Sequence, residues 1–439
     1  MKKLVTIRLM ICLAVALLGG TAAQDSVTQA ASKVKYPGPK QYIWRYTLRD
    51  KQGTAYALDH PGRWLSHKSI ERRRRQGLPL DSTDLPVSAK YLKEMERQAN
   101  QENNAQDATR DQGSAPPIRH RRHRPDWQFV GTSRWQNTVL VRSTDTLLLR
   151  SLASLDFVSE ARQVWQSPDS IERRSPKIKV HDGWNPWDSI RGDRYGNGRE
   201  QIEMLSGHRL HDIGCRGKGI TIAVIDGGFQ NCDEIPALQR ANIVGGKNFV
   251  WNPDESRRES RESRGQAPDL SMLQSEKPVP EILCRETDHG TKVLSTMATD
   301  EPQVLVGTAP EARYWLLRSE DPHSEQPVEE DYWTMAAEFA DSAGVDIISS
   351  SLGYSNYDGT DNDYRQRNLD GRTALISRSA SMLAQKGIIL VSSAGNSGMG
   401  PWKKIEVPGD ASDILTVGAL NRQKENAPSA AWVRRRTHG

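Results

Sequence analysis

The stretch ITIAVIDGGF, residues 220–229, decides the fold. It is apolar from Ile220 to Ile225 apart from Thr221, and it ends at Asp226, which two glycines follow. A near-continuous apolar strand is typical of a parallel sheet that is buried on both faces. Similar apolar runs alternate with helix-like segments over residues 199–428. We therefore predict an α/β domain there, with a parallel sheet covered by helices on both faces.

Two further stretches carry side chains that are suited to acid–base chemistry. His289 opens the helix-like DHGTKVLSTMA, residues 288–298, and Asn396 follows the strand-like IILVSSA in the turn AGNSG. Ligands bind at the carboxyl ends of parallel strands, so Asp226 and His289 are expected to meet there. The residues also allow a plainer interpretation, in which Asp226 caps a turn, His289 stands beside a helix cap and Asn396 only forms a turn.

The three motifs, taken in chain order, resemble those of the subtilisin-like serine proteases (peptidase family S8, the subtilases). The resemblance implies that Asp226 orients His289, that His289 is the general base and acid, and that Asn396 donates a hydrogen bond to the oxyanion. It also implies a groove for an extended polypeptide substrate. One wall of that groove is formed by Ser351, Leu352 and Gly353, and the other by Ala394 and Gly395.

The family's nucleophilic serine has no match after Asn396. The later serines at 397, 412 and 429 do not stand at a helix start after the Asn motif. We therefore expect a chain that is truncated before its nucleophile and without turnover as written. The tail SAAWVRRRTHG, residues 429–439, departs from the family pattern, and a single-base deletion near Pro428 would explain it. The alternative is a catalytically dead homologue that binds peptides or acts as a decoy.

The preceding unit, residues 35–167, is expected to be a small α+β domain. Strand-like QYIWRYTLRD, a helix over 66–77, strand-like WQNTVLVR, a helix over 144–155 and a strand near 157–165 follow one another. The unit resembles propeptides of secreted subtilases of the Bacteroidetes type, which implies an intramolecular inhibitor. We predict a flexible insertion near residues 100–125, a linker over 168–198 and a polar loop over 254–278.

The composition and the N-terminal sequence indicate which partners and which location to expect. The 439 residues carry a net charge of only +5, which argues against a nucleic-acid partner. Residues 1–23 have the basic start, short apolar run and small residues of a signal peptide, so we expect a protein that is secreted, periplasmic or at the cell surface, with no membrane span after cleavage.

Cysteines and metals remain open at this level. Export permits a bridge between Cys232 and Cys284, while Cys215 is left over, and three unpaired thiols fit equally well. No cofactor is implied with certainty. Asp226 and His289 lack a third ligand at metal spacing, so we predict no metal in the site, although structural calcium stays possible.

Overall fold

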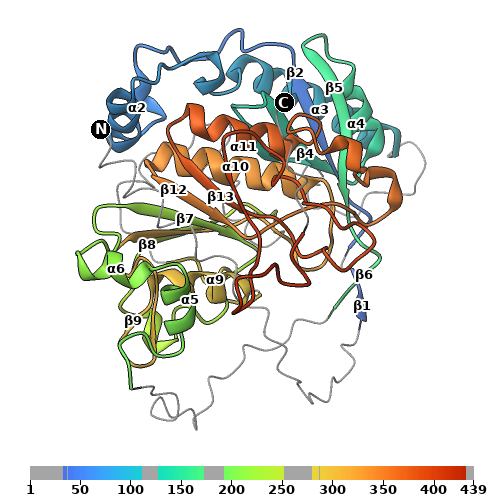
Figure 1. Ribbon diagram of the computed structural model, residues 1–439. Helices are drawn as coiled ribbons and strands as arrows, with labels where there is room; N and C mark the ends of the chain where they lie inside the picture. Colours follow the sequence, from blue (N-terminus) through green and yellow to red (C-terminus); the bar gives the residue numbers. More distant parts are fainter. Residues whose placement is uncertain are drawn as a thin grey trace.

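The computed structural model describes residues 33–36, 38–110, 127–172, 192–251, 279–285 and 287–431. A parallel sheet lies between helices on both faces, and a second, smaller α+β unit lies beside it (Figure 1). The predicted fold class is confirmed. The predicted signal peptide, the polar loop over 254–278 and the ends of the predicted insertion and tail lie outside the described residues.

The larger sheet has six parallel strands in the order β14-β13-β12-β7-β11-β8. Its strands are β7 (Thr221–Asp226), β8 (Asn242–Asn248), β11 (Arg313–Arg318), β12 (Ile347–Ser350), β13 (Ile389–Ser393) and β14 (Leu415–Val417). From β7 the chain crosses to the edge strand β8, returns to β11 between the two, and then passes to the other side of β7 to form β12. The carboxyl ends of β7 and β12 therefore flank the point where the strand order reverses, which is where open α/β sheets bind ligands.

Alternation along β7 explains why the sheet is covered twice. Ala223 and Ile225 belong to the core cluster that includes the helices α10 (Val328–Ala343) and α11 (Leu375–Gln385). Ile222 and Val224 belong to the opposite cluster, which contains the apolar side of α9 (His289–Ala298). Successive strand side chains point to opposite faces, so a run of apolar residues can fill two cores at once. None of the described helices combines the length and apolar character needed to cross a membrane.

Short elements complete the larger unit. They are α5 (Arg199–Met204), α6 (Gly207–Asp212), the 3-10 turn η5 (Pro236–Leu238), β9 (Asp300–Glu301), β10 (Leu305–Val306), η6 (Thr360–Asn362) and η7 (Gln366–Asn368). The helix-like pattern QIEMLSGHRLHDIG, residues 201–214, is split into α5 and α6, because Ser206 takes a left-handed conformation with φ of 59°.

The smaller unit has an antiparallel four-stranded sheet in the order β3-β4-β2-β5. Its elements are β1 (Lys33–Lys35), β2 (Tyr42–Leu48), η1 (Pro61–Arg63), α2 (His67–Gln76), η2 (Ser82–Asp84), α3 (Ala89–Arg110), β3 (Trp127–Ser133), β4 (Thr138–Ser143), α4 (Thr146–Ala153), β5 (Val158–Gln166) and β6 (Ser170–Glu172). Helix α2 begins at the cap Ser66 and ends at Gly77 in the left-handed conformation, as a C-terminal glycine predicts.

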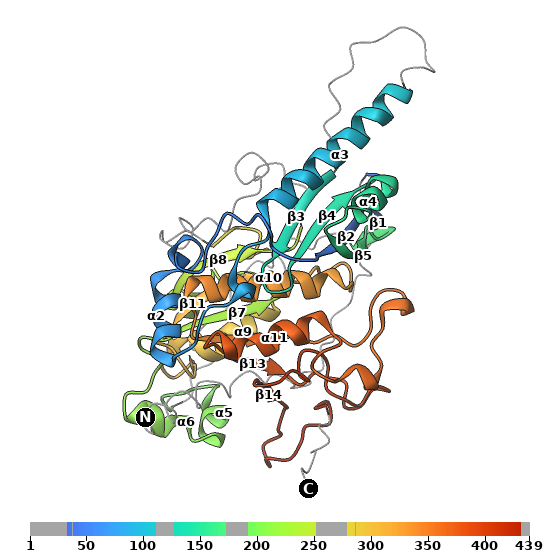
Figure 2. The same cartoon turned by 90° about the horizontal axis from the view of Figure 1, so that it is seen from above.

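Three expectations for the smaller unit need correction. The insertion predicted from residue 100 begins later, because α3 stays helical to Arg110 and projects away from the body (Figure 2). Its segment from 100 to 110 contains no Gly or Pro that would break a helix. We had predicted a loop there because the segment is polar. The strand β3 was not predicted, and β6 lies inside the predicted linker, where it pairs with β1.

Helix α10 joins the two units. Its residues Trp333, Ala336 and Ala340 belong to the core on the parallel sheet, whereas Val328 and Tyr332 pack with the smaller unit, whose α2 and β3 also contact the helix. A Cβ at Gly131 in β3 would come within 2.3 Å of the sulfur of Met335, so only glycine allows this close approach. The acidic residues of α10 are buried rather than solvated, and three of them, Asp331, Glu338 and Asp341, accept hydrogen bonds from the smaller unit.

Candidate active site

Asp226 and His289 meet at the carboxyl edge of the sheet. Asp226 is the last residue of β7 and is fully buried. The Nδ1 atom of His289 lies 2.9 Å from Oδ1 and 3.0 Å from Oδ2 of this carboxylate. A carboxylate only accepts hydrogen bonds, so Nδ1 carries the proton and Nε2 is left as the acceptor. The pair therefore has the arrangement of an oriented general base.

The backbone around both residues fixes this geometry. The N–H of Gly227 donates to Oδ1 of Asp226 over 2.8 Å. The N–H of Gly290 donates to the carbonyl of Gly228 over 3.0 Å, and a Cβ on Gly290 would lie 2.4 Å from that oxygen. Glycine at 290 thus lets α9 begin against the turn that follows β7. The hydroxyl of Thr287 accepts from the N–H of His289 over 3.2 Å, so Thr287 satisfies one of the free donors of the helix start.

Electrostatics favour the charged form of the histidine. The hydrogen bond from His289 to Asp226 raises the pKa of the imidazole, and burial opposes this rise. The His289 side chain is 52% exposed, so its outer edge faces solvent and is open to a substrate. Burial also raises the pKa of Asp226, against the hydrogen bonds from His289 and Gly227. The imidazole therefore holds a proton more strongly than a free histidine does.

Asn396 lies at the same edge, in the turn that follows β13. Its side chain is exposed. The turn is held by the N–H of Ala394, which donates to the carbonyl of Val417 over 2.9 Å, and by the N–H of Gly395, which donates to Oγ of Ser393 over 3.0 Å. Gly395 has φ of 91°, which only glycine adopts without strain.

The other predicted wall follows β12, the strand between β7 and β13. Leu352 is buried in the core that α10 and α11 cover, so its side chain anchors the segment. The Oγ atom of Ser351 is buried without a hydrogen-bond partner. Tyr354 then bridges to Val407, with N–H to carbonyl distances of 2.9 and 3.1 Å. The segments 351–353 and 394–396 thus leave the sheet on neighbouring strands, as two walls require.

Comparison with known proteins identifies the fold family. Residues 217–434 match the family model "Subtilase family" of peptidase S8, and residues 44–106 match the model "Peptidase S8 propeptide domain, Bacteroidota". The chain belongs to the subtilase family. The first match extends beyond residue 428, where we predicted the domain to end. The family is one of serine endopeptidases, and the smaller unit contains its propeptide domain.

Individual relatives are more distant. The minor extracellular protease Vpr of Bacillus subtilis (strain 168) is 29% identical over 210 residues, which is 47% of this chain but only 21% of the relative. Among solved structures, a mutant of the epidermin leader peptide processing serine protease of Staphylococcus aureus is 12% identical, with 89% of this chain and 73% of that one covered at a TM-score of 0.45. The PatG macrocyclase in complex with peptide is 17% identical, with 56% and 69% covered at a TM-score of 0.37.

The subtilase site also contains a carboxylate that the sequence did not single out. Glu320 follows β11 and borders a cavity of about 330 Å³ beside Gly227 and Thr287, together with Glu325 and Glu329. Burial, and then the charge of Glu325, raise the pKa of Glu320 to about 8. The hydroxyl of Tyr354 donates to Glu320 over 3.0 Å. The signal available in the sequence was its place after a strand of a parallel sheet, where polar residues gather around a site.

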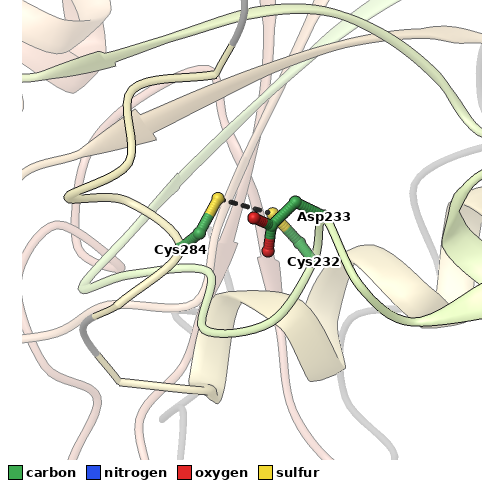
Figure 3. A group of neighbouring side chains, drawn as sticks. All are labelled: Cys232, Asp233 and Cys284. Carbon is green, nitrogen blue, oxygen red and sulfur yellow. Dashed lines mark hydrogen bonds between the residues drawn. The ribbon is translucent and has the colours of Figure 1, made fainter. Parts of the chain in front are cut away.

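Two cysteines of the subtilase domain form a group with Asp233. The sulfurs of Cys232 and Cys284 are buried and lie 3.5 Å apart, with the carboxylate of Asp233 beside them (Figure 3). Thiolates suit soft metals, whereas calcium takes oxygen ligands, so this group does not fit calcium. In the structure no disulfide joins the two cysteines, because the 3.5 Å between their sulfurs exceeds the ~2.05 Å of a disulfide bond.

Proposed function

We propose that this subtilase domain is part of a secreted serine endopeptidase precursor that hydrolyses peptide bonds. The observation that carries the proposal is the double contact of His289 Nδ1 with the buried carboxylate of Asp226, at 2.9 and 3.0 Å. With Nδ1–H held in this way, Nε2 can take the proton of an attacking hydroxyl and return it to the leaving amine. Asp226 orients the ring and stabilises the imidazolium that forms.

The neighbouring turns supply the other parts of this chemistry. We assign Asn396 to the oxyanion, because its exposed amide follows β13 at the same edge as the dyad. Such a donor contributes about 3–4 kcal/mol to transition-state stabilisation in the type system. Ser351, Leu352 and Gly353 on one side and Ala394 and Gly395 on the other would hold an extended polypeptide by its backbone.

The propeptide domain is proposed to inhibit the same chain. Strand β5 ends at Gln166, whose N–H and carbonyl each make a 2.9 Å hydrogen bond with the side chain of Gln326. Gln326 follows the segment 320–325, which borders the cavity beside the dyad. This contact supports the proposal, because it ties the end of β5 to a segment that borders the cavity beside the dyad. We further propose export through residues 1–23, in keeping with a relative whose name places it outside the cell.

The polypeptide of residues 1–439 is proposed to bind peptides without cleaving them. Within the part of the chain that the structure describes, no serine hydroxyl is hydrogen-bonded to His289, and its ring contacts Asp226. Removing the nucleophile from a triad lowers the rate about 10⁶-fold, because the remaining residues act as a unit with it. The same observation suits the second candidate, a peptide-binding homologue without catalysis.

Purified residues 1–439 test the proposal directly. A labelled extended peptide should bind, as measured by fluorescence anisotropy, while a fluorogenic peptide should be hydrolysed no faster than by the His289→Ala control. Absence of binding contradicts the groove, and hydrolysis above the control contradicts the loss of turnover. The DNA beyond codon 439, read in all three frames, separates the candidates, since a serine region of the family in another frame supports the precursor and its absence supports the binding protein.

A further inference from the structure

The floor between the two proposed groove walls is formed by the segment that starts at Glu406. The N–H of Glu406 donates to the carbonyl of Ala394 over 3.2 Å, so this residue is tied to one wall. The next residue, Val407, exchanges two backbone hydrogen bonds with Tyr354, which follows the other wall. Glu406 is therefore held by backbone bonds at the point where both walls meet.

The side chain of Glu406 points into the space between the walls. A Cβ built on Gly395 would lie 2.4 Å from its Oε2, and one built on Gly353 would lie 2.8 Å from the same atom. Two glycines from different strands thus make room for one carboxylate oxygen. A side chain at either position would close this space, so the glycines and the carboxylate together form the end of a pocket.

The carboxylate is only partly satisfied within the protein. Its Oε1 accepts a hydrogen bond from the hydroxyl of Ser397, beside Asn396. Among the described residues, no donor bonds to Oε2 and no cation forms an ion pair with Glu406. Burial raises the pKa of Glu406, against the bond from Ser397. A half-buried carboxylate without a cation is stabilised by any positive group that reaches it.

We propose that Glu406 determines substrate specificity by accepting the arginine or lysine side chain that precedes the scissile bond. This inference rests on the proposed peptide groove and adds the substrate class. A guanidinium entering between Gly353 and Gly395 would donate to Oε2, and the fixed backbone of Glu406 would keep the carboxylate in place.

The test uses residues 1–439 and two labelled peptides that differ at one position, arginine in one and citrulline, its neutral isostere, in the other. The wild-type chain should bind the arginine peptide about 10- to 100-fold more tightly, as close charge pairs in interfaces do. Glu406→Gln should reduce this ratio below about twofold and leave the citrulline peptide unaffected. Competition from the chain's own propeptide segment lowers both affinities equally, so it leaves the ratio unchanged.

Two variants control the experiment. Glu406→Asp keeps the charge and should keep a preference for arginine, which excludes a mere loss of folding. Asp413→Asn removes one exposed carboxylate of the same domain, at a left-handed position that asparagine tolerates, and should leave the ratio at its wild-type value. Equal binding of both peptides by the wild-type chain would overturn the proposed role of Glu406 and leave the proposed groove standing. Binding of neither peptide up to millimolar concentration would instead contradict the proposed groove itself.

Discussion

Replacing Asp341 by asparagine tests what holds the propeptide domain on the subtilase domain. Asp341 is a fully buried residue of α10, and its carboxylate accepts from three arginines of the smaller unit. The Nη2 atoms of Arg73 and Arg134 each lie 2.7 Å from its Oδ2, and Arg72 contacts Oδ1. Asparagine keeps the shape but turns one acceptor into a donor that faces guanidinium groups.

The expected loss of unfolding free energy is about 3–5 kcal/mol, the usual effect of removing one partner of a buried ion pair. We expect the lower part of this range, because the arginines keep other hydrogen-bond partners in the variant. Arg73 still pairs with Asp84 at 2.9 Å, and Arg134 still donates to Oγ of Ser342 at 3.0 Å. Urea unfolding followed by tryptophan fluorescence measures the change.

A matched control comes from α2, the helix that also carries two of these arginines. Glu71 pairs with Arg74 at 2.8 Å, but this pair is exposed, so Glu71→Gln should leave the midpoint of urea unfolding essentially unchanged. If Asp341→Asn destabilised the chain by no more than this control, the buried cluster would not be what joins the domains.

The pH dependence of the difference in unfolding free energy between wild type and Asp341→Asn provides a second check. Burial alone would raise the pKa of Asp341, but the charges of the three arginines outweigh it and hold the pKa below its usual range. A carboxyl with a lowered pKa in the folded state stabilises the protein at neutral pH and loses this effect as pH falls through that pKa. The gap between wild type and Asp341→Asn should therefore persist from pH 7 down to about 4 and close below it.

Two further predictions concern the dyad and the cysteines. The pKa of His289 should lie above the ordinary value of about 6.5 and should fall in Asp226→Asn, because the hydrogen bond to Asp226 is the main cause of its rise. NMR of the ring protons, assigned with His289→Gln, measures this pKa. An unchanged pKa in Asp226→Asn would refute the coupling between the two residues. Because the neutral imidazole exists only above the raised pKa, any hydrolysis should decline in acid. Glutathione disulfide should oxidise Cys232 and Cys284 to one disulfide while Cys215 stays alkylatable, because the two sulfurs are 3.5 Å apart. Peptide mapping by mass spectrometry would detect the bridge, whereas an unoxidised pair that binds stoichiometric zinc would indicate a metal site instead.

The strands of the sheet could be predicted because burial on both faces leaves a clear mark on the sequence. The apolar strand expected at 220–226 is β7, and the helix-like segment at 288–298 is α9, each to within one residue. The predictions were wrong for segments whose local composition favours one structure while their tertiary contacts favour another. Helix α3 is polar enough to suggest a loop. Strand β3 contains Gly131, where a larger residue would collide with the sulfur of Met335 in a helix that is distant in the sequence.

The sequence by itself determined the parallel α/β sheet, the family, and the positions of Asp226, His289 and Asn396 at strand and helix ends. These features depend on periodicity and on short motifs, which are local in the chain. The tertiary structure decided which charges meet. Asp341 is separated by more than 200 residues from the arginines that surround it, and Glu406 reaches the space between Gly353 and Gly395 only because β12 and β13 are neighbours. Contacts between distant segments depend on packing, and no local pattern records them.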